Sequence, residues 1–353
     1  MPAEPTDLAL DIAPNARHEI LDLRSLLSIE HRDALAPYQH CLYWSAHTTA
    51  GFLDRGLVNR LRPGKVPTYI NVLRTMFPEG AGYEHDHLER REDLNPDQRA
   101  IEPKNADSHL TFITGGLRSC VIHPNRPNEP VYFVELDGII DGRPRRRKTR
   151  VIGFQSETIV KELQVSVPVS SHPIDSINLK DPQLGLQEQF SELLSRAGIK
   201  KGRLTLSLSK TERHAGLTVN EFETLLMQHD LAEVIRNPLR FAAEKYRNAL
   251  ENPRAVPGKA LGYAKYDFIR LLNTSFDSLG LRNSIFEKLI ARTLAVPTSR
   301  FFRMKRSASL LVEQGPNGKT DFVEGAYQSP ILVQWQQAPG NTRTLNVILT
   351  SLT

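Results

Sequence analysis

Three histidines in distinct local settings are the residues of this chain best suited to carry chemistry. They are His47 in the segment SAHTT, His85 in YEHD and His109 in DSHL. Neutral imidazole is a common zinc ligand, and three protein ligands with an open fourth position are typical of a catalytic zinc site. The alternative is that these are unrelated members of a set of eleven histidines. We predict a divalent-metal site, with zinc as the first choice.

Three carboxylates are candidate catalytic acids or bases: Glu84, Asp86 and Asp137. If the segment around His85 is a loop, Glu84 or Asp86 could orient an imidazole or act as a general base. Asp137 precedes a glycine at a predicted strand end, a pair that is equally typical of a turn. The alternative for each of the three is a solvated surface carboxylate.

The densest positive charge in the chain is the segment RPRRRKTR at 143–150. In an extended strand, Arg145 and Arg147 face the same side, so they could bind a phosphate group through bidentate hydrogen bonds. The alternative is an edge strand whose charges protect it from aggregation. Both interpretations place this segment at the surface of a sheet.

Composition limits the classes of protein that remain. The 353 residues suffice for two domains, and 45 basic against 40 acidic residues give a net charge of +5. This charge suits an anionic ligand but is too small and too dispersed for nucleic acid. No membrane segment or secretion signal is evident, and Cys41 and Cys120 lie in apolar runs typical of buried free thiols. We therefore predict a cytoplasmic protein that contacts neither membrane nor nucleic acid.

Residues 7–157 resemble the YjbQ family, whose members are described as secondary thiamine-phosphate synthases. The family pattern is matched, in order, by HTTA at 47–50, YEHD at 83–86, SHL at 108–110, GLRS at 116–119 and RRR at 145–147. The resemblance implies a β-rich domain in which the three histidines form a metal site. It also implies that Arg118 and Ser119, in the family's G-[TS]-S strand, supply further donors to a bound phosphate.

The pattern recurs, more diverged, in the second half of the chain. Its pieces are the strand-like segments 203–209 and 215–221, SAS at 307–309, GAYQ at 325–328 and the closing segment 343–349. Tyr327 and Gln328 stand in the family's G-T-W-Q strand, and we predict that they bind substrate. The chain is thus predicted to be α+β, with two YjbQ-like β-sandwich domains in tandem at 7–157 and 160–353.

The two halves differ in the residues that they retain. The positions of His47 and His109 fall on Glu212 and Arg300 in the second half, and a guanidinium cannot bind a metal because it stays protonated. The first half in turn lacks the glutamine strand. One composite site drawing on both halves would explain this division, and ordinary decay of a duplicate explains it equally well.

Helical segments are predicted in the second half. Leu186, Phe190, Leu193 and Leu194 predict an amphipathic helix over 184–197 that ends at Gly198. Residues from about 222 to 298 depart from the family, and the segments 222–231, 239–250, 266–272 and 284–294 read as helices separated by proline pairs. We predict a helical insertion that serves as a lid or an oligomer contact.

The resulting hypothesis is a metal-dependent enzyme that transfers or hydrolyses an anionic group of a phosphorylated or otherwise anionic small molecule. A metal would lower the pKa of a bound water or draw charge from a diphosphate leaving group. The alternative is a non-catalytic, oligomeric small-molecule-binding protein whose metal is structural. Because single-domain relatives are described as trimers, we also predict a homo-oligomer, either a trimer of tandem chains or a dimer.

Overall fold

A computed structural model describes residues 4–61, 64–238, 240–242, 244–245 and 304–353. The chain divides into two compact units. The strand-rich unit comprises Met1–Gly56, Gly116–Phe222 and Met304–Thr353, and the helical unit comprises Leu57–Gly115 and Glu223–Arg303. Each unit therefore draws on both halves of the sequence.

The strand-rich unit contains two pairs of antiparallel sheets. In the first sheet pair, one sheet has the order β1-β9-β3-β5 and the other has the order β2-β6-β4. Their bounds are β1 Thr6–Ile12, β2 Glu19–Asp22, β3 His40–Ser45, β4 Ala50–Phe52, β5 Cys120–Pro124, β6 Tyr132–Glu135 and β9 Arg147–Phe154. A small hairpin of β7 (Ile139–Ile140) and β8 (Arg143–Pro144) precedes β9.

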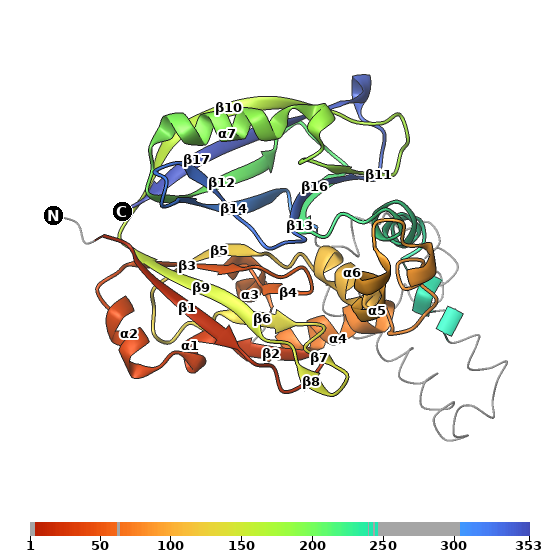
Figure 1. Ribbon diagram of the computed structural model, residues 1–353, viewed down its shortest axis with the longest axis horizontal. Coiled ribbons are helices and arrows are strands. Elements are labelled where there is room, and N and C mark those ends of the chain that lie inside the picture. The colour runs from red at the N-terminus through yellow and green to blue at the C-terminus, as the bar shows by residue number, and fades with distance from the viewer. Residues whose placement is uncertain (1–3, 62–63, 239, 243, 246–303) are drawn as a thin grey trace. The chain divides into compact units, whose positions relative to one another are not determined.

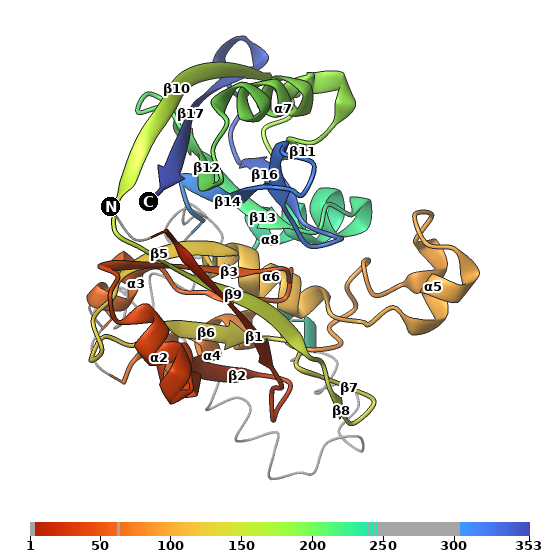
Figure 2. The ribbon, with the colours of Figure 1, turned by 60° about the vertical axis from the view of Figure 1, so that its left-hand side comes forward.

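The second sheet pair repeats this strand order. Its sheets are β10-β17-β12-β14-β15 and β11-β16-β13, so β10, β17, β12 and β14 occupy the places of β1, β9, β3 and β5 (Figures 1 and 2). Their bounds are β10 Glu157–Pro168, β11 Asp175–Asn178, β12 Lys201–Leu208, β13 Ala215–Asn220, β14 Ser307–Gln314, β15 Thr320–Val323, β16 Ser329–Gln334 and β17 Thr342–Leu352. The added strand β15 extends one edge.

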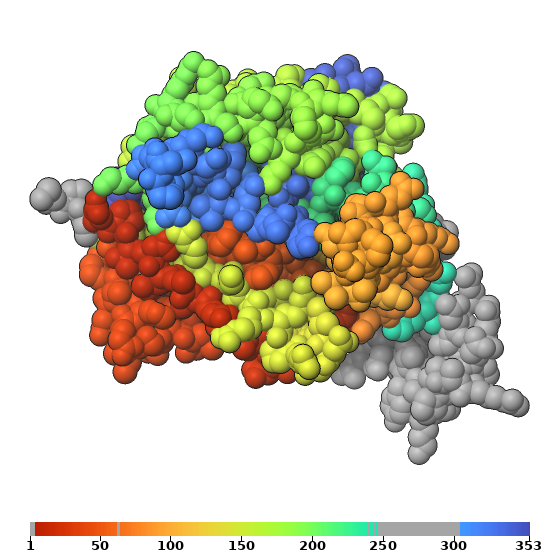
Figure 3. Space-filling view, in the orientation of Figure 1, coloured from red at the N-terminus to blue at the C-terminus, as the bar shows by residue number. Residues whose placement is uncertain are grey.

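Each sheet pair has a hydrophobic cluster with members from both of its sheets. In the second pair, alternate residues of β12 are buried, which is the period that one core-facing side of a strand produces. Helix α7 (Leu186–Ala197) adds Leu186, Phe190 and Leu194 to this cluster and ends at Gly198, whose φ of 61° suits glycine. Figure 3 shows the green surface of α7 against the blue residues of the β14–β15 region, in agreement with their packing.

The remaining helices are divided between the two units. In the strand-rich unit lie α1 Leu23–Leu26, α2 Ile29–Leu35, η2 Pro182–Leu184 and η8 Pro339–Asn341, while α3 Arg55–Arg60 is divided between the units. The helical unit contains α4 Val66–Met76, η1 Leu88–Arg90, α5 Pro96–Ile101, α6 Ala106–Thr114, the π-helix η3 Leu225–Asp230 and α8 Leu231–Arg236. Helix α4 packs on α6, and η3 continues directly into α8.

Several sequence predictions concern this architecture. The mixed α/β composition with antiparallel sheets, the opening strands of both halves, the helix over 184–197 and two buried free thiols are confirmed. The predicted helix at 222–231 is helical from Thr224, as the π-helix η3 that continues into α8. The predicted helices at 266–272 and 284–294, like Arg300, lie outside the described residues. Within the described stretches, no helix combines the length and apolar character that crossing a membrane requires.

Candidate functional site

The three predicted metal-binding histidines are divided between the two units. His47 belongs to the strand-rich unit, whereas His85 and His109 belong to the helical unit. Among the residues that the structure describes, no group of three or more His, Cys, Asp or Glu side chains is arranged to hold a metal ion. The surroundings of His47 and of the His85–His109 pair therefore define two separate candidate sites.

His47 lies in the turn that connects β3 to β4, and its ring is fixed by a backbone group. Its Nε2 accepts a hydrogen bond of 2.9 Å from the backbone N–H of Lys148. Burial, together with repulsion by Arg147, Arg145 and Lys148, lowers the pKa of His47 to about 3. The ring is thus neutral at physiological pH, with its proton on Nδ1. Because the Nε2 lone pair is used, this conformation offers a hydrogen-bond donor at Nδ1 rather than a metal ligand at Nε2.

The two arginines predicted to bind phosphate both contact carboxylates. Arg147 is fully buried, and its guanidinium forms a bidentate pair with Glu135 at 2.5 and 2.6 Å. Arg145 is partly exposed and pairs with the buried Asp137. The Lys148 side chain is exposed and forms no ion pair with any described residue. The predicted acid Asp137 therefore acts here as the partner of an arginine.

The glutamine predicted to bind substrate instead holds the turn that carries His47. The Nε2 of Gln328 donates to the backbone oxygens of Ser45 and His47, at 2.9 and 3.1 Å, and the side chain is buried. Asn220 donates to the next carbonyl, that of Thr48, at 2.7 Å. Tyr327, which precedes Gln328 in the predicted motif, is 60% exposed. Residues from the second half of the sequence thus position the turn of the first half.

Arg118 and Ser119 are also engaged within the strand-rich unit. Arg118 donates to the backbone oxygen of Ser307 at 2.8 Å, and its Nε lies 3.7 Å from a carboxylate oxygen of Asp54. Ser119 is buried, and its backbone oxygen accepts the N–H of Ser45 at 2.8 Å. Both residues lie where the predicted phosphate-binding strand runs, but their contacts are structural.

In the helical unit, His85 is completely buried and contacts a carboxylate. Its Nδ1 lies 3.0 Å from Oε2 of Glu223. Burial raises the pKa of Glu223, but hydrogen bonds from His85 and from two backbone N–H groups outweigh burial and hold the pKa below its ordinary value. The same Nδ1 also lies 3.0 Å from Nη1 of Arg91, which can only donate, so its two neighbours favour opposite tautomers. The other nitrogen, Nε2, faces the side-chain amide of Asn105 at 3.4 Å.

The π-helix places a second acid on the same segment. Asp230, the last residue of η3, accepts the backbone N–H groups of Glu84 and His85, each at 3.0 Å. The buried Arg91 adds a positive charge close by, with its Nε 3.6 Å from Glu223. Glu223 and Asp230 are seven residues apart, and π-helical turns occur often at functional sites. The start of the predicted insertion is therefore part of the His85 environment.

His85 and His109 lie edge to face, at a ring spacing that two imidazoles on one metal ion would also have. Their ring centroids are 5.3 Å apart, close to the ~5.2 Å expected for two imidazoles on one tetrahedral zinc ion with ordinary Zn–N bonds. A carboxylate on the far nitrogen, as Glu223 provides for His85, is the usual partner of a metal-bound imidazole. The donor set described here supplies two ligands and not the predicted three.

The remaining predicted acids are engaged near His85. Glu84 pairs with Arg90, and the hydrogen bond from this arginine lowers the pKa of Glu84. Asp86 accepts the backbone N–H of Ala106, the first residue of α6, at 3.1 Å. In this structure both carboxylates hold the loop and the helix that carry His85 and His109. The prediction that they are catalytic stays a prediction.

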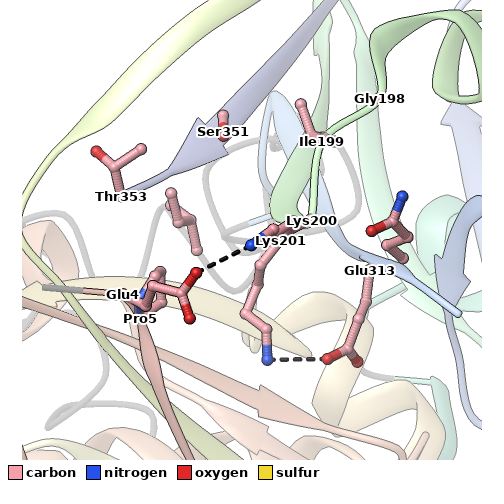
Figure 4. Close-up of a pocket in the computed structure, with 11 residues that line it drawn as sticks. Glu4, Pro5, Gly198, Ile199, Lys200, Lys201, Glu313, Ser351 and Thr353 are labelled. Carbon is pink, nitrogen blue, oxygen red and sulfur yellow. Dashed lines mark hydrogen bonds and ion pairs between the residues drawn. The ribbon is translucent and has the colours of Figure 1, made fainter. Parts of the chain in front are cut away.

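A cavity of about 590 Å³ in the strand-rich unit has none of the predicted site residues in its lining. In Figure 4, Lys200 reaches Glu4 and Lys201 reaches Glu313 across it, at 2.9 Å each. Because these lysines are paired with carboxylates, the cavity offers no excess of positive charge to an anion.

Sequence reasoning missed Glu223, Asp230, Arg91 and Asn220. Glu223 precedes the helix and Asp230 ends the π-helix η3, so their spacing of seven residues is not an α-helical signal. Arg91 pairs with its near neighbour Asp93, whereas Asn220 contacts Thr48, which is remote in sequence.

Comparison with known proteins gives only distant structural similarity. No family model and no curated protein matches the sequence. A YbjQ-like protein of unknown function from Sulfolobus solfataricus is similar at 15% identity, with a TM-score of 0.28, over 56% of this chain and 99% of that one. A hypothetical protein from Aeropyrum pernix is similar at 17% identity, with a TM-score of 0.28, over 54% and 98%.

A third solved structure belongs to an uncharacterised conserved protein of the yjbq/upf0047 family from Clostridium acetobutylicum. It is 17% identical, with a TM-score of 0.27, over 41% of this chain and 97% of that one. Two of the three neighbours thus carry the name of the family that the sequence resembles. TM-scores this far below 0.5 carry no argument, so any function must be inferred from the chain's own residues.

Proposed function

We propose that the protein acts on a phosphorylated or otherwise anionic small molecule, by transfer or hydrolysis of its anionic group. The observation that carries this proposal is the charge around His47. Three cations, Arg145, Arg147 and Lys148, surround a neutral imidazole with a donor at Nδ1, and two carboxylates, Glu135 and Asp137, pair with two of these cations. Asp137 also pairs with Arg17, so positive charge is in excess around this turn, and cations with N–H donors are the groups that bind phosphate.

A divalent metal, with zinc as the first choice, is the second part of the proposal. His85 and His109 would hold it, with Glu223 beside the His85 ring, and a bound metal would supply Lewis-acid chemistry at that pair. His47 is not included, because its Nε2 accepts the Lys148 N–H. His47 instead donates to the anion in this proposal.

The resemblance and the repeated strand order support a more specific architecture. We propose that the two sheet pairs are YjbQ-like sandwich domains in tandem, with boundaries near 7–157 and 160–353. A transfer of the thiamine-phosphate-synthase type, a homo-oligomeric state and a cytoplasmic location belong to the same proposal. The equivalent order of seven strands in each pair supports the tandem arrangement.

A non-catalytic protein with a structural metal is the second candidate. The burial of the two histidines favours it, because the relative exposure of His85 is 0% and that of His109 is 1%, and structural zinc sites are closed to solvent. Under this alternative the chain would bind the anion without converting it.

Metal content and turnover together test the proposal. The protein, purified without added metal or a histidine tag, should contain about one metal ion per chain, retained in His87→Ala and lost in His85→Ala and His109→Ala. His87 is a suitable control because its side chain is 42% exposed two residues from His85. Release of phosphate or diphosphate from a panel of phosphate esters and diphosphates would support the enzyme.

The remaining outcomes decide between the candidates. Metal loss that unfolds the protein, with anion binding but no turnover, would favour the binding protein. Absence of metal even after zinc is added back would remove the metal from the proposal. Absence of phosphate binding in wild type, or equal binding in His47→Phe and in the exposed control His172→Phe, would refute the role of the His47 turn.

A further inference from the structure

Two buried arginines occupy equivalent places in the two sheet pairs. Arg147 begins β9, and Arg343 is the second residue of β17, the strand that takes the place of β9 in the second pair. The exposure of each arginine is 2%. An arginine this deeply buried must have its charge and its donors matched by protein groups.

Both arginines contact the end of the corresponding central strand in the same way. Arg147 bonds through Nε to Glu135, the last residue of β6, and through Nη2 to the backbone oxygen of Asp137 at 2.8 Å. Arg343 bonds through Nε to Gln334, the last residue of β16, at 3.1 Å, and through Nη2 to the backbone oxygen of Gln336 at 2.6 Å. The carbonyl lies two residues beyond the strand end in both cases.

The turn residues are equivalent as well. In the first pair, His47 Nε2 accepts the N–H of Lys148, the residue after Arg147, at 2.9 Å. In the second pair, Glu212 Oε1 accepts the N–H of Thr344, the residue after Arg343, at 2.8 Å. The second carboxylate oxygen of Glu212 accepts from Arg343 Nη1 at 2.9 Å.

The compensating carboxylate has therefore changed places between the two pairs. In the first, the strand end carries the acid, Glu135, and the turn carries the neutral His47. In the second, the strand end carries the neutral Gln334 and the turn carries the acid, Glu212. Each arginine keeps one carboxylate among these two positions, which is what burial of a single charge requires.

We propose that these two positions exchange one carboxylate as a unit, and that this exchange leaves the His47 turn, and not the Glu212 turn, able to bind an anion. At the Glu212 turn, a protein carboxylate already occupies the donors of Arg343 and Thr344, and it repels a second anion. At the His47 turn, the neutral ring presents a donor beside Lys148 and Arg145. The exchange itself is independent of the proposed function, whereas the anion binding rests on the proposed function.

Double-mutant cycles test the exchange without any ligand. Glu135→Gln should lower the melting temperature by roughly 6–12 °C, because it leaves Arg147 without a carboxylate. Adding His47→Glu should restore at least half of this loss, since the new carboxylate takes the place that Glu212 has in the second pair. Glu162→Gln, on the exposed strand β10, is the control and should leave the melting temperature unchanged.

A second cycle applies the same reasoning in reverse. Glu212→Gln should destabilise the protein, and adding Gln334→Glu should restore part of the loss. The recovery should be smaller here, because Gln334 also donates to the backbone oxygens of Ser170 and His172. The proposal is overturned if neither double variant is more stable than its single variant, Glu135→Gln or Glu212→Gln. It is also overturned if a single variant fails to fold and the second substitution does not restore folding.

Calorimetric titration with inorganic phosphate tests the second part. Wild type should bind one phosphate per chain, and His47→Glu should weaken binding at least tenfold. Two phosphates per wild-type chain would overturn the claim that only one of the two turns binds an anion. Charge rescue in the cycles without any phosphate binding would keep the exchange and refute the proposed function of the His47 turn.

Discussion

Replacement of Gln328 by alanine isolates the contribution of the second half to the turn that carries His47. The change removes three hydrogen bonds: two from Nε2 to the backbone oxygens of Ser45 and His47, and one from the backbone N–H of Gly325 to Oε1 at 3.0 Å. A hydrogen bond contributes about 1 kcal/mol net to stability, and unsatisfied buried partners raise the cost. We therefore expect the free energy of unfolding to fall by about 3 kcal/mol.

The matched control is Gln337→Ala, because Gln337 is exposed and forms one side-chain hydrogen bond, to Asn341. This control should change the unfolding free energy by less than about 0.5 kcal/mol. Urea denaturation followed by the fluorescence of Trp44 and Trp335 measures both variants, and the amide of Lys148 should exchange hydrogen faster in Gln328→Ala. If Gln328→Ala costs no more than the control, the second half does not position this turn.

Three further predictions concern burial, close approach and the His85 loop. His123 is buried, and burial lowers its pKa to about 4. As pH falls, His123 is therefore protonated first in the unfolded chain, and the free energy of unfolding should decline by about 3 kcal/mol between pH 6.5 and 4. A flat profile in wild type, or an unchanged decline in His123→Phe, would contradict this prediction. A Cβ on Gly325 would lie 1.8 Å from a backbone oxygen, whereas a Cβ on Gly315 would meet a movable side chain. Gly325→Ala should therefore unfold at a much lower temperature than Gly315→Ala. Equal melting temperatures would refute the close approach. Asp230→Asn should lower the free energy of unfolding by about 1–3 kcal/mol and speed amide hydrogen exchange at His85, because one of two backbone donors loses its acceptor. Unchanged exchange at His85 would show that the carboxylate does not hold the loop.

Local patterns in the sequence predicted much of the strand-rich unit. The alternation at 203–209 and the heptad-like spacing of Leu186, Phe190 and Leu194 predicted β12 and α7, because each face of these elements is buried or exposed as a whole. Longer-range features were less predictable. The boundary between the two compact units does not follow the repeat, since 57–115 and the residues after 222 pack together, and no local periodicity reports which distant helices share a core.

The candidate site shows the same division. The sequence singled out His47, His85 and His109 by their residue type and setting, and the basic segment at 143–150 by its charge. It could not show that Lys148 takes the Nε2 lone pair of His47, because a backbone N–H carries no sequence signal and this contact spans 101 residues.

By itself, the sequence determined the alternating strands, the amphipathic helix, the repeated pattern of the two halves and the choice of histidines and arginines as candidates, since each is set by residue type and local spacing. Only the tertiary structure decided which of these groups is neutral, which is paired and which is a donor. Arg147 is bound by Glu135 and Arg343 by Glu212 because folding brings one carboxylate to each buried charge. The protonation of His47 follows from Lys148, a partner 101 residues away, and chemistry of this kind depends on distance in space rather than distance along the chain.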